Sequence, residues 1–381
     1  MKLTENPRRW DPKNRLTAPE SPTSNEHMLK YGSKNIKTGV LYFFVHFVIE
    51  LISFAILSSR FAATQVVFTV MLFDFLAFVP QGLLGRFFET HKKIHIGYIG
   101  MAFLAVSVIL CSISDSFWFN FGIVFLGIGN ALLHVLGAID TISNSESKIF
   151  ASTIFVGGGS FGLCLGKMYH YLSDELLWLL IAAGIGFVLI FLSDRLRAKE
   201  FREADFRYPD FDIVNPRIPL MFVLFCVFIT TVIRGFAAYT IPTAWCDETW
   251  EICALYFFMG SGKVFGGYAC DRWGYRNVGI FTTLCAIPFL VLGNNNMLVS
   301  VFGIFLFSMT MGISFAMGVS VLKDSAALAF GITTIGLILG AFLNYVYRQT
   351  ELRNMILITV LSIVCAILFA ITLKKKKEKL K

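Results

Sequence analysis

Seven ionisable side chains lie inside long apolar runs, where a charge is costly and is usually kept for a function. In sequence order they are His46, Glu50, Asp74, His134, Lys167, Arg234 and Lys263. In such surroundings carboxyl and imidazole groups can take up and release protons, and guanidinium and ammonium groups can bind anions. The set therefore predicts proton transfer and anion binding inside a membrane.

His46 and Glu50 lie four residues apart in the run VHFVIE, so in a helix they share one face. We expect Glu50 to carry a coupling proton and His46 to tune its proton affinity, with Asp74 and His134 as further proton sites. His134 can equally be a hydrogen-bonding residue in helix packing. Glu50 and Arg234 can also form a buried pair that only holds helices together.

Arg234 is the residue that we expect to contact a solute, because a guanidinium binds carboxylate or phosphate groups through two parallel hydrogen bonds. Lys263 adds positive potential, and it can instead pair with Asp74. The other candidate contacts are Lys167, Asn130, Tyr239 and Asn344. Each has a plainer alternative: the lysine can extend to the outer membrane surface, the asparagines can bridge helices, and the tyrosine can face lipid.

The composition places these residues in an integral membrane protein. Of the 381 residues, 56% are hydrophobic and 15% are charged, with a mean hydropathy of +0.69. Soluble globular chains carry about 25% charged residues. The net charge of +8 does not indicate nucleic-acid binding, because the basic residues lie at the ends of apolar runs and in two tails. We expect a lipid bilayer around the chain and no nucleic-acid partner.

Twelve apolar runs come close to the roughly 20 residues that cross a bilayer. They are 39–59, 64–84, 96–112, 117–138, 150–171, 175–193, 218–243, 252–269, 277–293, 297–319, 326–346 and 354–373. A polar linker, 195–216, separates a bundle of six spans at 39–194 from a second at 217–373. Two halves of nearly equal length are typical of an internal repeat.

The repeat is also visible in single residues. Gly162 and Gly166 of the fifth span match Gly336 and Gly340 of the eleventh at a constant offset of 174. Glycines four residues apart let two helix backbones approach closely, which suits a sliding contact between helices.

The distribution of basic residues sets the orientation. With the N-terminus in the cytoplasm, 27 of the 33 lysines and arginines fall in cytoplasmic segments and three fall in outer loops. The polar residues 1–38 predict a disordered cytoplasmic tail and no cleavable signal peptide. Residues 374–381, KKKKEKLK, predict a basic cytoplasmic tail at the anionic inner leaflet.

The end of the eighth span reads GYACDRWGYR and resembles the loop signature G-x-x-x-D-R-x-G-[RK]-[RK] of the major facilitator superfamily. It is not a phosphate loop, since the preceding GSGK lacks the earlier glycine and the Ser or Thr that such a loop needs. Asp271 can cap a neighbouring helix N-terminus, and Gly274 permits a tight turn. The resemblance implies a cytoplasmic gating element made of Gly267, Asp271, Arg272, Gly274 and Arg276.

A weaker copy, GRFFETHKK, follows the second span. Gly85 and Glu89 keep their places in the signature, but Thr90 stands where the family has Arg. This departure puts in doubt a latch that is symmetric between the two halves.

A finer resemblance is to the fosmidomycin-resistance-like branch of the superfamily. That branch has a His and an acid four apart in its first helix, as in VHFVIE, and glycine-rich runs in its fourth and fifth, as in GIGNALLH and VGGGSFGLCLG. Val135 departs from the Pro that often follows the His of the fourth helix. The resemblance implies proton-driven export of small anionic or aromatic molecules.

We therefore predict an all-α integral membrane protein with the major facilitator fold: twelve transmembrane helices in two six-helix halves, both termini cytoplasmic, a monomer in the plasma membrane. The expected function is secondary active transport of a small anionic or zwitterionic solute by alternating access, coupled to protons, in the direction of efflux. Proton-coupled uptake of an organic anion and a transport-inactive sensor are the alternatives.

We expect neither an enzyme nor a cofactor or metal site, because no nucleophile–base pair or metal-spaced cluster is apparent in the sequence. The eight cysteines form no C-x-x-C pair. Cys246 and Cys253 flank a short polar loop and could form a disulfide, which the sequence alone does not decide.

Overall fold

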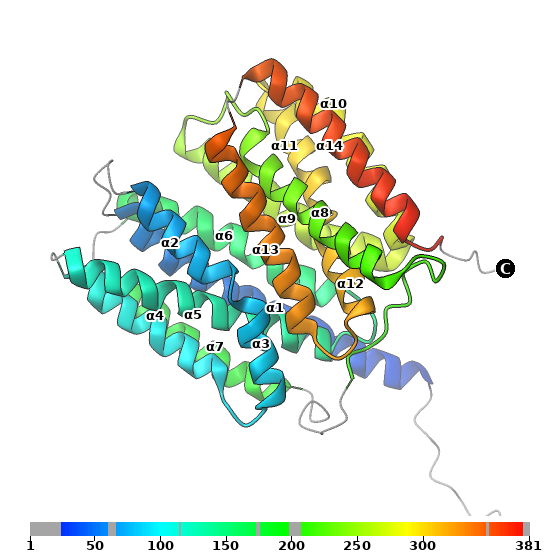
Figure 1. Cartoon of the computed structure of the whole chain (residues 1–381). Coiled ribbons are helices and arrows are strands. Elements are labelled where there is room, and N and C mark those ends of the chain that lie inside the picture. The colour runs from blue at the N-terminus through cyan, green and yellow to red at the C-terminus, as the bar shows by residue number, and fades with distance from the viewer. Residues whose placement is uncertain are drawn as a thin grey trace, which may run out of the picture.

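The structure is a computed structural model that describes residues 24–59, 66–113, 116–172, 176–197, 207–347 and 350–375. Those residues form fourteen α-helices in two bundles that lie side by side (Figure 1). The first bundle contains α1 (Ser24–Ser59), α2 (Val66–Phe78), α3 (Gln81–Thr90), α4 (Ile96–Ser112), α5 (Ser116–Ser143), α6 (Phe150–Leu172) and α7 (Leu176–Leu196). The second contains α8 (Leu220–Thr240), α9 (Thr249–Trp273), α10 (Tyr275–Leu292), α11 (Met297–Ser308), α12 (Met311–Val321), α13 (Ala326–Val346) and α14 (Glu351–Thr372).

Two of the expected spans are each broken into two helices. The second span consists of α2 and α3, which meet at Pro80, a residue that has no backbone N–H to continue the helix. The tenth consists of α11 and α12, with Met309 and Thr310 between them. Among the described residues, nine helices or helix pairs are long and apolar enough to cross a membrane. α4 is apolar but has 17 residues, and α6 and α9 fall outside that set, so the count of twelve spans stays a prediction.

The expectation of a disordered tail over residues 1–38 is wrong for its last part. α1 begins at Ser24, so residues 24–38 are helical and continue the first span. Asn35 there donates a hydrogen bond to the backbone oxygen of Ser145, 3.2 Å away. Residues 1–23, and 376–381 of the basic tail, lie outside the described residues.

The repeated glycines pack helices together within each bundle. A Cβ atom at Gly162 on α6 would overlap the backbone oxygen of Phe47 on α1. In the second bundle a Cβ at Gly340 on α13 would overlap the backbone oxygen of Val232 on α8. These glycines therefore form close backbone contacts between equivalent helix pairs, α1 with α6 and α8 with α13.

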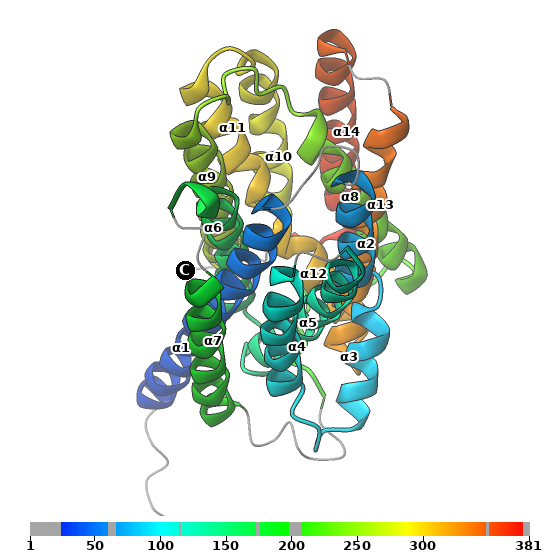
Figure 2. The same cartoon turned by 90° about the vertical axis from the view of Figure 1, so that its left-hand side faces the viewer.

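Other glycines form the contacts between the bundles. α6 lies along α9, where Gly157 faces Gly260 and Val264 (Figure 2). α3 lies against α13, where Gly82 faces Gly331 so closely that a Cβ on Gly82 would lie 3.3 Å from its partner's Cα. Glycine at these positions lets helix backbones of the two bundles approach closely.

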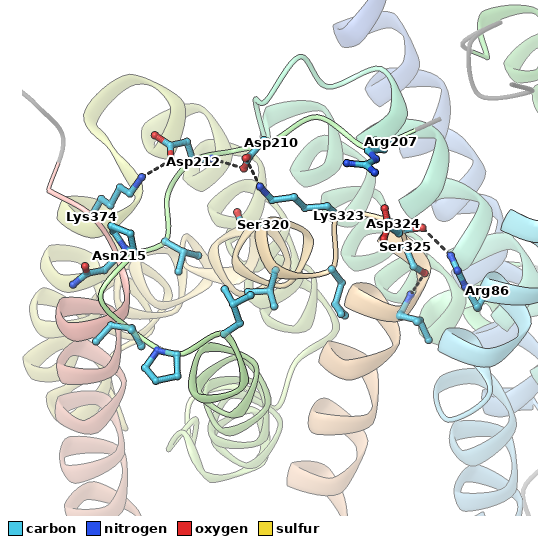
Figure 3. Close-up of a pocket in the computed structure, with 18 residues that line it drawn as sticks. Arg86, Arg207, Asp210, Asp212, Asn215, Ser320, Lys323, Asp324, Ser325 and Lys374 are labelled. Atoms are coloured by element: carbon cyan, nitrogen blue, oxygen red, sulfur yellow. Dashed lines mark hydrogen bonds and ion pairs between the residues drawn. The ribbon is translucent and has the colours of Figure 1, made fainter. Parts of the chain in front are cut away.

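The described part of the linker begins at residue 207 and runs across one end of both bundles. We call this end of the molecule the linker end. Asp210 pairs with Lys323 at 2.5 Å, and Asp212 pairs with Lys374 (Figure 3). The backbone N–H of Lys374 donates to Ile213, at 2.8 Å, beside an antiparallel bridge between Val214 and Leu373. The linker is therefore tied to the α12–α13 turn and to the end of α14.

Gly162→Val tests the packing within the first bundle. The added Cβ meets the backbone of α1, which cannot move aside as a side chain can, so we expect a loss of about 1–3 kcal/mol or more in the free energy of unfolding. Thermal unfolding of the purified protein in detergent should show a lower Tm. Gly184→Val on α7 is the matched control, because nothing lies within 4 Å of a Cβ there. Equal Tm values for the two variants would contradict the packing described.

Candidate functional site

A cavity of about 360 Å³ lies between the two bundles. Seven of the residues that the sequence singled out line it: His46, Glu50, Asp74, His134, Arg234, Tyr239 and Lys263. They come from α1, α2, α5, α8 and α9, so residues far apart in the sequence meet in one space. Three other expected solute contacts, Lys167, Asn130 and Asn344, are not among its lining residues.

On the first bundle, two histidines flank Glu50. α1 presents His46 one turn before Glu50, with the His46 Nε2 atom 3.7 Å from Glu50 Oε1. α5 brings His134 Nε2 to 3.4 Å from the same oxygen. The two imidazole rings meet edge to face with centroids 4.3 Å apart, and all three side chains are buried.

Each histidine is oriented by a backbone carbonyl. His46 Nδ1 lies 2.9 Å from the oxygen of Phe155, and His134 Nδ1 lies 3.0 Å from the oxygen of Asn130. A carbonyl oxygen only accepts hydrogen bonds, so both Nδ1 atoms carry hydrogen and donate. These two hydrogen bonds orient the rings so that both Nε2 atoms face Glu50.

The two asparagines join helices instead of lining the cavity. Asn130 on α5 donates to Glu50 Oε1 at 3.1 Å and to Ser53 Oγ at 3.2 Å, both on α1. Asn344 on α13 donates to the backbone oxygen of Phe236 on α8, at 3.2 Å. Their positions fit the helix-bridging alternative better than direct solute contact.

Arg234 on α8 is held by the break between α11 and α12. Its Nη2 atom donates to the backbone oxygen of Phe307 at 3.1 Å and to the hydroxyl of Thr310, and the guanidinium lies 5.0 Å from the centre of the Phe307 ring. Within the described chain no carboxylate forms an ion pair with Arg234, so the buried Glu50–Arg234 pair considered from the sequence is not formed. The charge is available to a solute.

Lys263 on α9 donates to the Ser160 hydroxyl on α6 at 2.8 Å. The alternative pairing with Asp74 is therefore not formed in this structure. Asp74, from α2, lines the same cavity. The cavity is thus divided: Glu50, Asp74 and the two histidines lie on the first bundle, and both cations lie on the second.

Lys167 lies near the far end of α6, away from the linker end. Its ammonium group donates to the Tyr256 hydroxyl at 2.9 Å and lies near the Tyr256 and Phe54 rings. The exposed position agrees with a lysine that extends toward the membrane surface. Cys246 and Cys253 are both free thiols, and Cys253 Sγ instead lies 3.5 Å from Cys164 Sγ.

The residues expected to form a gating element cap a helix of the opposite bundle. Asp271, near the end of α9, accepts hydrogen bonds from the backbone N–H groups of Ile149 and Phe150, at 3.1 and 3.0 Å, where α6 begins. Gly274 has φ = 92°, the left-handed region that glycine adopts at no cost. Gly267 packs against Thr153 of α6, and Arg276 donates to the oxygen of Ala370. Arg272 lies exposed in the last turn of α9.

The weaker first-half copy forms the equivalent cap in the other direction, from the first bundle to the second. The sequence had put such a symmetric arrangement in doubt. Glu89, at the end of α3, accepts from the backbone N–H of Ala327 at 3.0 Å and from the Ser325 hydroxyl, where α13 begins. Arg86 lies 3.7 Å from this carboxylate and supplies the positive charge that Thr90 lacks. Gly85 packs against Ala327.

Tyr208 of the linker reinforces this cap, a contact that the sequence did not suggest. Its hydroxyl donates to Glu89 at 2.7 Å. Burial and the neighbouring Glu89 carboxylate raise the pKa of Tyr208 well above its usual value, so the tyrosine remains a donor. The linker therefore holds both bundles at this end.

Asp271→Ala tests the caps. Hydrogen bonds to a charged group contribute about 1.5–3 kcal/mol each, so amide exchange of Ile149 and Phe150 should quicken by roughly 10- to 100-fold. Hydrogen–deuterium exchange with mass spectrometry measures this directly. Glu89→Ala is the mirror variant and should release the first turn of α13. Unchanged exchange at both helix starts would mean that the carboxylates do not hold the bundles together.

The chain matches no family model, and no curated protein matches its sequence. Solved structures do match. One, of a variant of the E. coli fucose:proton symporter FucP, has a TM-score of 0.63 at 14% identity, covering 89% of this chain and 98% of that one. Another, of the major facilitator superfamily transporter FucP in the outward conformation, has a TM-score of 0.61 at 13% identity, with coverages of 88% and 98%. Through this likeness, the chain is shown to have the major facilitator fold.

Proposed function

We propose that this chain is a proton-coupled secondary transporter of the major facilitator superfamily that moves a small anionic or zwitterionic organic solute across the plasma membrane as a monomer. The observation that carries the proposal is the divided cavity: proton-binding groups on the first bundle face Arg234 and Lys263 on the second, and no carboxylate among the described residues forms an ion pair with either cation.

Solute binding is assigned to Arg234, with Lys263 and Tyr239 beside it. The Nη2 atom of Arg234 is held by the α11–α12 break, so the guanidinium is fixed in position while its other N–H groups can bind an anion. A fixed fork of donors binds a carboxylate in two hydrogen bonds with little loss of side-chain freedom. Lys263 adds a second positive charge, which donates to the Ser160 hydroxyl and to no carboxylate in the described part of the chain.

Proton coupling is assigned to Glu50, with His46, His134 and Asp74 as the groups that share or tune the proton. A proton on this cluster changes the charge that faces Arg234 across the cavity. An anion bound at Arg234 changes the field at Glu50 in return. This reciprocal effect is the linkage that couples two gradients.

Gating is assigned to the two caps at the linker end. Opening that end requires Asp271 to leave α6 and Glu89 to leave α13, while the glycine contacts let the bundles separate. A sensor without transport was suggested mainly by the degraded first-half motif. Because Glu89 still caps α13, that argument loses its basis.

Direction is the finer question. The resemblance in the first, fourth and fifth spans favours export against protons, which we propose. The proton symport named for FucP would instead favour uptake with protons. Solute affinity measured against pH separates the two: exchange requires that protonation weaken solute binding, and symport requires that it strengthen binding or leave it intact.

Arg234→Gln tests the solute site by thermal stabilisation of the purified protein against anionic, zwitterionic and cationic solutes. A ligand at about 100 times its Kd stabilises by roughly 2.7 kcal/mol, so a bound anion should raise the Tm of the wild type. The variant should lose this increment whatever its own baseline Tm. Lys167→Gln is the matched control, a cation outside the cavity, and should keep the increment. Stabilisation by cations or neutral aromatics alone would make Arg234 structural.

Glu50→Gln tests the coupling in proteoliposomes. The amide cannot exchange a proton, so a pH gradient should no longer drive solute movement, while exchange of labelled for unlabelled solute should persist. Glu146→Gln, an exposed glutamate, serves as the control and should transport normally. Full gradient-driven flux in Glu50→Gln would remove Glu50 from the coupling.

A further inference from the structure

Three hydrogen-bond acceptors converge at one point of the cavity wall. Nε2 of His46 and Nε2 of His134 lie 3.7 and 3.4 Å from Oε1 of Glu50. Ligand atoms of all three side chains lie within 4.8 Å of one another. Because both Nδ1 atoms donate to backbone carbonyls, neither Nε2 atom carries a hydrogen when its ring is neutral.

One proton does not satisfy this cluster. A proton on either histidine gives that ring a hydrogen to donate, but the other ring still turns a lone pair toward a carboxylate oxygen. Protonating both rings places two cations with centroids 4.3 Å apart in a buried site. A single doubly charged ion among the three atoms satisfies all of them at once.

We propose that His46, Glu50 and His134 bind one divalent transition-metal ion of the Zn²⁺ class, through the two Nε2 atoms and Oε1. Two neutral imidazoles and one carboxylate are a donor set typical of such ions, and they leave coordination positions open. The three residues line the cavity, so the open positions face the space where a solute enters.

Two of the three distances between ligand atoms fit with small adjustments. Bonds of about 2.0–2.2 Å in a tetrahedral site place neighbouring ligand atoms about 3.3 Å apart. The two measured separations, 3.4 and 3.7 Å, differ from that by a few tenths of an ångström. The third separation, between the two Nε2 atoms, is within 4.8 Å, and rotation of the two histidine side chains must shorten it when an ion binds.

The surroundings of the three ligands also resemble those of a metal site. A metal-bound histidine almost always donates its other N–H to a carbonyl or carboxylate, as His46 does to Phe155 and His134 to Asn130. Asn130 also donates to the ligating oxygen Oε1 from behind, at 3.1 Å. These contacts orient the donor atoms before any ion arrives.

The nearby charges favour an ion that brings an anion with it. Lys263 and Arg234 line the same cavity and oppose a bare cation, whereas Asp74 favours one. An anion in the open coordination positions offsets both cations. The inference rests on the proposed function in one respect only, that a solute enters this cavity. It adds that a bound metal ion competes with the coupling proton for Glu50.

Co²⁺ binding to the full-length protein in detergent tests the site, because its visible absorption reports nitrogen and oxygen ligands directly. The wild type should bind one Co²⁺, displaced by Zn²⁺. His134→Gln should weaken binding by more than the ~10- to 100-fold that loss of an outer-shell partner costs. His91→Gln, an exposed histidine at the end of α3 that does not line the cavity, is the matched control and should bind Co²⁺ as the wild type does. Circular dichroism and Tm confirm that each variant is folded.

Two outcomes would overturn the inference: no absorption band in the folded wild type at millimolar Co²⁺, or a band that His134→Gln leaves unchanged. A chelator in the transport assay separates this inference from the proposed function. If gradient-driven flux persists with chelator and the protein binds no Co²⁺, the proposed transport function stands and the proposed metal site is rejected. If Co²⁺ binds but no flux is observed, the metal site stands and the proposed transport function is rejected.

Discussion

A charge inside an apolar interior must be matched by a partner, and this constraint organises the centre of the molecule. Glu50 accepts a hydrogen bond from Asn130 and is flanked by two histidines. Lys263 is met by Ser160 of the other bundle, and Arg234 by backbone and hydroxyl oxygens at a helix break. None of these cations is neutralised by a carboxylate within the described chain, which leaves positive potential facing the cavity. If carboxylates neutralised both cations, no positive charge would remain in the cavity to bind a solute.

The same principle operates at the linker end with helix termini as partners. The first N–H groups of α6 and α13 have no acceptor within their own helices. Asp271 and Glu89 supply acceptors from the opposite bundle, so each bundle completes a helix of the other. Such bonds are strong enough to hold one conformation, and water can replace them when the end opens. The glycine contacts beside them bring the helices of the two bundles close together at positions that carry no side chain of their own.

Hydropathy alone predicted the positions of most helices, because lipid exposure demands long apolar helices. Local chemistry predicted the Asp271 cap and the Gly274 turn. The helix breaks at Pro80 and at Met309 were missed, although the proline was a readable signal. The partners of Lys263 and Arg234 were also missed, since they lie on helices whose juxtaposition only the fold decides. For the same reason the sequence showed no metal-like spacing: His134 comes from a different helix than His46 and Glu50.

Pulsed electron paramagnetic resonance distances would test the central claim, alternating access about the cavity, most directly. Exposed label positions are available at the linker end, Leu83 with Met221, and at the opposite end, Phe117 with Leu298, in a chain whose eight cysteines are replaced. The account predicts two distance populations at each end that exchange with pH or bound anion, one end lengthening as the other shortens. A single population at both ends, unchanged by pH or any solute, would contradict it.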